Sequence, residues 1–273
     1  MSYFKYLDKN VYYEITGSGE PVIILNGIMM STKSWAPFKS NLSEHFQLIL
    51  VDFLDQGQSD SYESDYTQDI QVELVKALLM HLNLNKIHLV GISYGGEVAL
   101  QFAAKYPQFI ERLIIYNSLP YTTYTLAKTG HLWNQFAQAK DAIQYYEATI
   151  PIIYSKAFNE RQKAWMEQRK QYLINHVFND PVFLNRMIRL TNSAENYDIR
   201  HKLDKIQVPV MVVGAEEDYL TPLVHQRILN NNLPNSRLVI LPNVGHASMY
   251  EVPEVFTTIL IGFLKTSLNF NIT

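Results

Sequence analysis

The stretch of sequence that decides the fold covers residues 87–107 and reads IHLVGISYGGEVALQFAAKYP. It opens with a short, apolar and partly β-branched run at residues 87–90, which is typical of a strand buried on both faces. Glycines follow, and apolar residues then recur at helical spacing over 98–103. Pro107 cannot continue a helix and marks its end. The pattern predicts a strand, a sharp turn and a helix.

The sharp turn carries one serine between glycines, because Gly91, Ser93 and Gly95 match the pattern G-x-S-x-G. Flanking glycines allow the backbone to bend tightly, so that the serine hydroxyl projects above the edge of the sheet. A pattern with three fixed positions also arises by chance in small-residue loops. Ser93 is therefore a candidate nucleophile whose partners must be sought elsewhere in the chain.

Other buried-strand candidates recur along the chain, and helical periodicity such as that of residues 70–82 lies between several of them. The apolar runs are PVIILNG (21–27), FQLILVDF (46–53), RLIIYNS (112–118), VPVMVVGAEED (208–218) and SRLVILPN (236–243). Continuous apolar strands alternating with helices predict an α/β fold with a mostly parallel sheet covered on both faces. The more alternating segment FKYLDKNVYYEITG (4–17) predicts an antiparallel hairpin at the sheet edge.

Residues 119–203 interrupt this rhythm, because they contain no convincing buried strand but several aromatic-rich helical patterns. We interpret them as a helical cap inserted into an α/β core made of residues 1–118 and 204–273. Most of the aromatic side chains are expected to form the core of the insertion itself. No repeat or linker separates the insertion from the rest, so we expect it to belong to one domain.

The composition limits the classes of partner. The chain has 273 residues, 23 basic against 26 acidic, and a formal net charge of -3, which offers no electrostatic footprint for nucleic acid. It has no cysteine, which excludes disulfides, thiolate metal sites and a cysteine nucleophile. The first residues lack an apolar signal core, and no run is long enough to span a bilayer. We expect a cytoplasmic protein with a small-molecule substrate, no metal and no membrane insertion.

A serine nucleophile needs a general base within hydrogen-bond reach and a third group that orients the base. Among the eight histidines, His246 follows Gly245 and a predicted strand and precedes the helix that closes the chain. That loop position makes His246 the candidate base. His81, His88 and His225 fall inside helix or strand patterns and are better explained as surface or core residues.

The orienting acid is expected at the carboxyl end of the strand at 208–218, where parallel sheets bind their ligands. Glu216, Glu217 and Asp218 cluster there. Position allows either Glu216 or Asp218 to serve, and the other acids then belong to a solvated loop.

Taken together, these motifs resemble the α/β-hydrolase fold superfamily over almost the whole chain. The matching segments are GISYGG (91–96), VDFLDQGQSD (51–60), DIRHKLDKIQVPVMVVGAEEDYLTP (198–222) and LVILPNVGHASMYEVPE (238–254). The resemblance implies a catalytic triad of Ser93, Asp218 and His246, in the chain order that this topology requires. In the alignment of motifs, the catalytic acid of the family falls on Asp218.

The segment PVIILNGIMMS (21–31) departs from the family, which usually has a histidine-glycine pair where this chain has Asn26-Gly27. Asn-Gly between apolar runs is also a hairpin signal, but hairpin strands should alternate and residues 22–25 do not. We therefore predict a loop that points toward the site.

The resemblance further implies an oxyanion hole made of the backbone N–H groups of Ile28 and Tyr94, with Met29 as the alternative to Ile28. Met29 and Met249, near the motif loops, are candidate substrate-binding residues. No cluster of basic residues stands out to hold an anion, so an uncharged acyl group is expected. An arginine of the insertion such as Arg186 or Arg189 would overturn that expectation.

These features predict a serine hydrolase, similar to a carboxylesterase or thioesterase, that cleaves a small to medium, mostly apolar acyl ester or thioester without a cofactor. The same triad would serve a carbon-carbon bond hydrolase, a lactonase, a haloperoxidase or an acyltransferase. A non-catalytic ligand receptor of the same fold is the alternative from another class. Epoxide hydrolases and haloalkane dehalogenases of this superfamily use aspartate where this chain has Ser93.

Overall fold

The computed structural model describes residues 2–267 and contains one eight-stranded sheet with the order β1-β2-β4-β3-β5-β6-β7-β8. β1 and β2 form an antiparallel hairpin at one edge, β2 pairs antiparallel with β4, and the remaining neighbours are parallel. The predicted α/β fold class is confirmed. The strands are β1 (Ser2–Tyr6), β2 (Lys9–Thr16), β3 (Pro21–Leu25), β4 (Gln47–Val51), β5 (Ile87–Ile92), β6 (Ile110–Tyr116), β7 (Val210–Ala215) and β8 (Ser236–Leu241).

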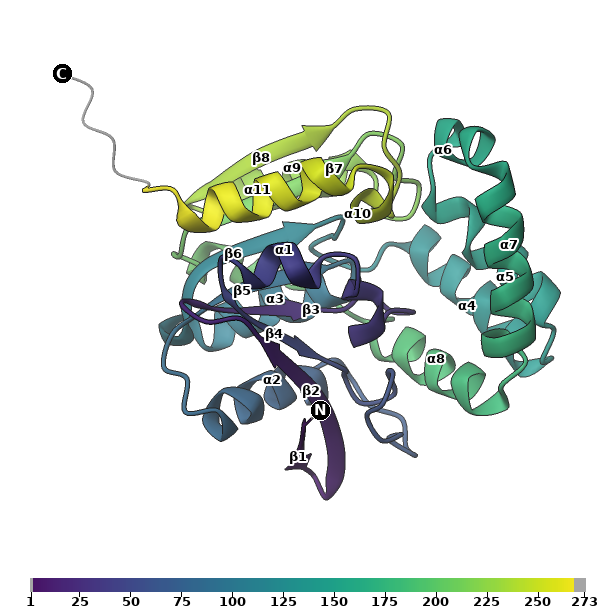
Figure 1. Cartoon of the computed structure of the whole chain (residues 1–273), viewed down its shortest axis with the longest axis horizontal. Coiled ribbons are helices and arrows are strands. Elements are labelled where there is room, and N and C mark those ends of the chain that lie inside the picture. The colour runs from purple at the N-terminus through teal and green to yellow at the C-terminus, as the bar shows by residue number, and fades with distance from the viewer. Residues whose placement is uncertain (1, 268–273) are drawn as a thin grey trace.

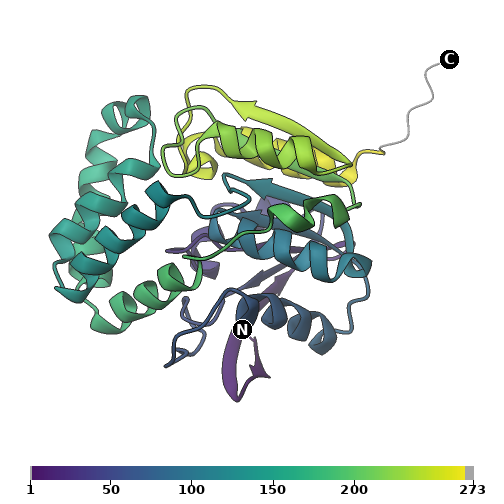
Figure 2. The ribbon, with the colours of Figure 1, turned by 180° about the vertical axis from the view of Figure 1, so that it is seen from behind.

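Helices cover both faces of this sheet. The core helices are α1 (Lys39–Ser43), α2 (Asp69–His81), α3 (Tyr94–Lys105), α9 (Leu223–Asn232), α10 (Ser248–Glu251) and α11 (Pro253–Lys265), with short 3₁₀ turns η1 (Thr32–Trp35), η2 (Pro107–Phe109) and η5 (Arg200–Lys205). α1 and α11 lie on the face turned to the viewer in Figure 1, and α2, α3 and α9 cover the face seen in Figure 2.

Burial on both faces explains why the strands read as continuous apolar runs. In β3, Ile23 and Leu25 belong to the hydrophobic cluster under α2 and α3, whereas Val22 and Ile24 belong to the cluster under α1 and α11. Successive side chains of a strand point to opposite faces, so both sets must be apolar when both faces are covered.

Helices fill the long connection between β6 and β7. They are α4 (Tyr124–Gln138), α5 (Ala142–Thr149), η3 (Pro151–Ile153), α6 (Lys156–Arg161), α7 (Lys163–Leu173), the π-helical turn η4 (Ile174–Phe178) and α8 (Pro181–Ser193). Residues 119–203, all of which the structure describes, hold no strand of the sheet and only an isolated bridge between Tyr121 and Asp198. We call α4 to α8 the cap.

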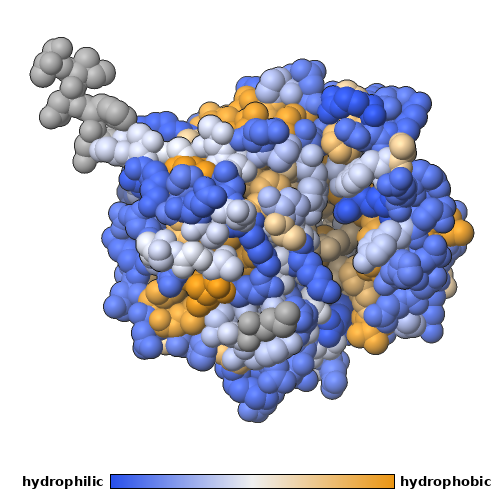
Figure 3. Space-filling model, viewed as in Figure 1, coloured by the Kyte–Doolittle hydropathy of each residue, from blue (hydrophilic) through white to orange (hydrophobic). Residues whose placement is uncertain are grey.

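The cap lies beside the carboxyl ends of the parallel strands, at the right of Figure 1. In the space-filling view of Figure 3, the surface is hollowed between the cap and the sheet domain, with hydrophobic residues along the hollow. Within residues 2–267, no helix is both long enough and apolar enough to cross a membrane.

Candidate active site

Ser93 occupies the turn between β5 and α3 in a conformation that is rare for a residue with a side chain. Its φ is 52° and its ψ is -117°. The neighbouring glycines allow this bend: a Cβ on Gly91 would lie 2.5 Å from the carbonyl oxygen of Gly95, and one on Gly95 would lie 2.3 Å from that of Leu25. The glycine spacing of the motif therefore follows from close backbone approach, and the strained serine is held at the end of the strand.

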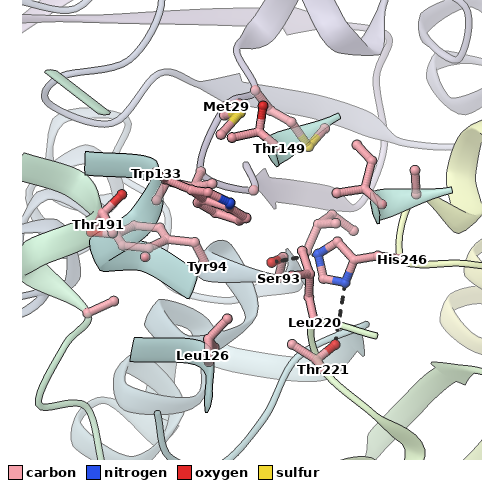
Figure 4. A pocket seen from close by; sticks show the side chains of 18 of the residues that line it. Met29, Ser93, Tyr94, Leu126, Trp133, Thr149, Thr191, Leu220, Thr221 and His246 are labelled. Carbon is pink, nitrogen blue, oxygen red and sulfur yellow. Dashed lines mark hydrogen bonds between the residues drawn. The ribbon is translucent and has the colours of Figure 1, made fainter. Parts of the chain in front are cut away.

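The three predicted catalytic side chains form one hydrogen-bonded chain. The Nε2 atom of His246 lies 2.9 Å from the Oγ atom of Ser93, and its Nδ1 atom lies 2.7 Å from the Oδ2 atom of Asp218. Figure 4 shows the imidazole ring of His246 beside Ser93 at one side of a pocket. This geometry lets Nε2 accept the serine proton while the carboxylate holds Nδ1–H.

Asp218 is buried and fully hydrogen-bonded. Its carboxylate accepts bonds from the N–H groups of Leu220 and Thr221 at 2.9 and 2.8 Å, from the Thr221 hydroxyl at 2.7 Å and from the Asn117 amide at 3.1 Å. Burial alone would raise the pKa of Asp218, but the imidazole of His246 and the bonds from Thr221 outweigh it and hold this pKa below its ordinary value. The carboxyl group therefore stays ionised as a partner for His246.

The other two acids of this loop point elsewhere. The Glu216 carboxylate accepts the N–H of Asn243 at 3.1 Å, and the Glu217 carboxylate accepts the N–H of Lys156 at 3.1 Å. By its position in the sequence, either Glu216 or Asp218 could be the orienting acid. In the structure, Asp218 contacts His246 and Glu216 does not.

Ile28 and Tyr94, the two residues predicted to form an oxyanion hole, both line the same cavity as Ser93. Tyr94 is the first residue of α3, so its N–H has no partner in the helical ladder. Ile28 lies in the loop after β3, where the Gln56 amide donates to the carbonyl oxygens of Gly27 at 2.9 Å and of Ile28 at 3.2 Å. Gln56 thereby orients the peptide planes of this loop. It lies in the family-like segment VDFLDQGQSD (51–60), but no role was predicted for it.

Comparison with known proteins agrees with this architecture, since a family model described as the alpha/beta hydrolase fold matches residues 20–253. The chain belongs to this family. It is similar to MGS-M2, an alpha/beta hydrolase enzyme from a Medee basin deep-sea metagenome library, with 47% identity and a TM-score of 0.97 over 99% of this chain and 100% of that one.

A second relative of this chain is the proposed carbamate hydrolase RutD of Yersinia enterocolitica, which is 28% identical over 93% of this chain and 92% of its own length. The enol-lactonase of Burkholderia xenovorans LB400 shares the fold at 21% identity, with a TM-score of 0.85 over 97% of this chain and 100% of that one. The predicted family is confirmed, and hydrolase activity is the function that the family and its members support.

Asn26, which stands where this family usually has histidine, is fully buried and fully bonded. Its Nδ2 atom donates to the carbonyl oxygen of Val51 at 2.9 Å and to the Oε1 atom of Gln56 at 3.2 Å, and its Oδ1 atom accepts from the Trp35 indole at 2.8 Å. In this α/β hydrolase the asparagine therefore joins the loop after β3 to β4, to Gln56 and to the helical turn η1.

The cavity at Ser93 has a volume of about 180 Å³, and its wall is mostly apolar. Met29 and Met249, the predicted substrate-binding residues, both line it, whereas His81, His88 and His225 do not. Figure 4 shows Met29, Leu126, Trp133 and Leu220 around Ser93. The apolar wall is contributed by the core and by the cap together: Ile28, Met29, Met30, Ile92, Leu126, Ala127, Trp133, Ile150, Ile153, Leu220, Ala247 and Met249.

Arg186 and Arg189, either of which would have overturned the expectation of an uncharged acyl group, do not line this cavity. Arg186 donates to the Ser61 hydroxyl at 2.8 Å, and Arg189 forms an ion pair with the buried carboxylate of Asp55. Both arginines hold α8 against the loop that follows β4.

Proposed function

We propose that this α/β hydrolase is a serine hydrolase that cleaves a small to medium, mostly apolar acyl ester or thioester through an acyl-enzyme. The observation that carries the proposal is the hydrogen-bonded series Asp218, His246 and Ser93, which opens onto an apolar cavity. Because a buried acid, a histidine and a strained serine meet there, the site has the groups that acyl transfer requires.

In the proposed reaction, the Ser93 oxygen attacks the scissile carbonyl carbon while His246 Nε2 takes the hydroxyl proton. The carbonyl oxygen becomes negative and accepts hydrogen bonds from the N–H groups of Ile28 and Tyr94, of which one typically contributes about 10²–10³ in rate. His246 then returns the proton to the departing alcohol or thiol. Water attacks the acyl-enzyme by the same route and releases the acid and free Ser93.

A first experiment asks whether Ser93 is the nucleophile. A fluorophosphonate should label the protein, and mass spectrometry of the digest should place the label on Ser93. Turnover should then be measured on neutral esters, thioesters, a lactone, a carbamate and a vinylogous diketone, because names of relatives include lactone and carbamate cleavage. Ser93→Ala should remove both label and turnover, and a folded Ser93→Ala protein with wild-type turnover would overturn the proposal.

A second experiment tests the choice of acid. Asp218→Asn should lower kcat by a factor on the order of 10²–10⁴, because the amide no longer stabilises the protonated imidazole. Glu216→Gln is the matched control, since this carboxylate contacts the backbone of Asn243 instead of His246, and kcat should stay within about threefold of the wild type. The assignment is wrong if Glu216→Gln is the damaging change and Asp218→Asn is mild.

A further inference from the structure

One arginine of the cap, Arg169 in α7, lies in the wall of the catalytic cavity. It lines the cavity that contains Ser93 and His246, and it also lines the neighbouring cavity between the cap and the loop after β4. Its side chain therefore stands where the two cavities adjoin, on the cap side of the proposed reaction site.

Arg169 has no carboxylate partner among residues 2–267, unlike Arg189 and Arg200, which form ion pairs with Asp55 and Asp198. Its Nε atom is buried and, within the same residues, makes no hydrogen bond. The residue as a whole is half-buried. Its charge is partly removed from water without an opposite charge beside it, so an anion bound at this position would interact favourably with it.

Two aromatic rings hold the guanidinium without neutralising it. Its central carbon lies 5.2 Å from the ring centre of Trp165 and 5.8 Å from that of Tyr250. Ring faces attract a cation but offer no lone pair to its N–H groups. The side chain is thus positioned while its hydrogen-bond donors stay available.

The surroundings of Arg169 are rich in donors and poor in free acceptors. Burial raises the pKa of Tyr154 and of Tyr250, and the positive charge of Arg169 opposes the rise in both. The Tyr154 hydroxyl is itself buried without a hydrogen-bond partner in the described chain. The carboxylate of Glu251, which also acts on Tyr154, already accepts bonds from Ser155 N–H at 2.7 Å and from the Ser155 hydroxyl at 2.6 Å.

We propose that Arg169 binds a carboxylate carried by the substrate at a distance from its scissile carbonyl. The inference rests on the proposed ester hydrolysis and adds a charged subsite to it. The planar guanidinium can donate two parallel hydrogen bonds to a carboxylate, which a single ammonium cannot match. The substrate is then apolar where it meets Trp133, Leu126 and Met249 and anionic at its end near Arg169.

The experiment compares esters that differ only in charge. One pair is the monoethyl ester of adipate and its neutral terminal amide, with the charge on the acyl half. The other pair is the acetyl ester of γ-hydroxybutyrate and its amide, with the charge on the alcohol half. We expect the carboxylate of one pair to have a kcat/KM roughly ten- to a hundredfold above its amide, mainly through KM, and the pair identifies the half that reaches Arg169.

Arg169→Gln should reduce that ratio of carboxylate to amide kcat/KM to about one, and Arg169→Lys should restore part of it. The matched control is Arg161→Gln. Arg161 is an exposed arginine of the cap that stacks on Phe158, and it lines neither cavity. Equal kcat/KM for carboxylate and amide in both pairs, or a preference that survives Arg169→Gln, overturns the inference.

Binding measured without turnover separates this inference from the proposed function. In Ser93→Ala the intact esters can be titrated by calorimetry, where the carboxylate should bind more tightly than the amide and lose the advantage when Arg169→Gln is added. If the wild type hydrolyses neutral esters but Ser93→Ala binds the carboxylate and the amide equally well, the charged subsite alone is overturned. A protein that binds the carboxylate through Arg169 but hydrolyses no ester overturns the proposed function alone.

Discussion

At the scale of single residues, Asn26 shows how one polar side chain can hold a loop on which the proposed reaction depends. It is fully buried, yet each polar atom of its amide has a partner on another segment: Val51, Gln56 and Trp35. Gln56 in turn donates to the carbonyl oxygens of Gly27 and Ile28. The orientation of the Ile28 peptide therefore depends on Asn26 and Gln56, neither of which lines the cavity at Ser93.

Asn26→Ala should lower the free energy of unfolding by about 2–4 kcal/mol, because the Trp35 indole N–H and the Gln56 Oε1 atom lose a buried partner. It should also lower kcat more than it changes KM, since in the proposed reaction the Ile28 N–H stabilises the transition state. Urea denaturation and ester kinetics measure the two effects. Asn232→Ala is the control, because Asn232 is exposed at the end of α9 and should matter by less than about 0.5 kcal/mol. Equal stability of the two variants would contradict the role of Asn26.

At the scale of secondary-structure elements, the turn from β5 into α3 is tightly constrained by close backbone contacts. Gly95 is the first-turn residue of α3 that packs against the end of β3, where any Cβ would meet the Leu25 carbonyl oxygen at 2.3 Å and that of Asn26 at 2.7 Å. Gly262 in helix α11 has open space instead. Apart from its chain neighbours and the nearby backbone of its own helix, no atom lies within 4 Å of the position that a Cβ would take.

The two glycines make a matched pair for glycine-to-alanine substitution. Gly95→Ala should destabilise the protein by roughly 1–3 kcal/mol or more, because a backbone carbonyl cannot move aside as a side chain can, and it should reduce labelling of Ser93. Gly262→Ala should stabilise by about 0.5–1 kcal/mol, since alanine is the better helix former. Thermal unfolding and fluorophosphonate labelling report both, and destabilisation by Gly262→Ala would contradict the open environment described for that site.

At the scale of the whole molecule, the cavity exists because the cap and the sheet domain are joined by specific polar contacts. The Tyr94 hydroxyl in α3 lies 2.9 Å from the Ser193 hydroxyl in α8, and Arg189 of α8 pairs with Asp55 of the core. Tyr94, the residue that follows Ser93, thus also contacts the cap. The shape of the pocket is a property of both parts together.

The buried carboxyl group of Glu97 predicts how global stability depends on pH. Burial raises the pKa of Glu97 to about 8, and its Oε2 atom accepts one hydrogen bond from Gln68. The unfolded chain loses this proton near the ordinary value of about 4.3, so folding takes up a proton between these two pH values. The contribution of Glu97 to stability is therefore complete at low pH and declines as pH rises toward 8.

Glu97→Gln should remove this decline, because the amide keeps an acceptor for Gln68 without a titrating proton. Urea denaturation at about pH 5 and about pH 8 should show a smaller loss of unfolding free energy for the variant than for the wild type. Glu254→Gln, at an exposed position of α11, should leave the wild-type difference unchanged. A wild-type pH dependence in Glu97→Gln would show that this carboxyl group does not titrate in the buried state.

Much of the fold could be predicted because its signals are local. Apolar runs of strand length predicted the parallel strands, and the alternating segment at 4–17 predicted the antiparallel hairpin, as the sheet confirms. Burial on both faces of a strand forces the side chains of that strand to be apolar whatever they pack against. Ser93 and His246 were predicted as catalytic from local signals as well, because Ser93 lies between Gly91 and Gly95 and His246 follows Gly245 in a loop after a strand. Their catalytic roles stay predictions.

What only the tertiary structure decided depends on residues distant in the sequence. Position alone could not separate Glu216 from Asp218, and the resemblance to the family favoured Asp218. Only the structure shows which carboxylate the loop turns toward His246, 28 residues further along the chain. No role was predicted for Gln56 or for Arg169. Their positions are set by packing, which brings Gln56 against the Ile28 loop and Arg169 into the cavity wall. Sequence patterns record which face of an element is buried, whereas the partner of a polar side chain is set by how the elements pack against one another.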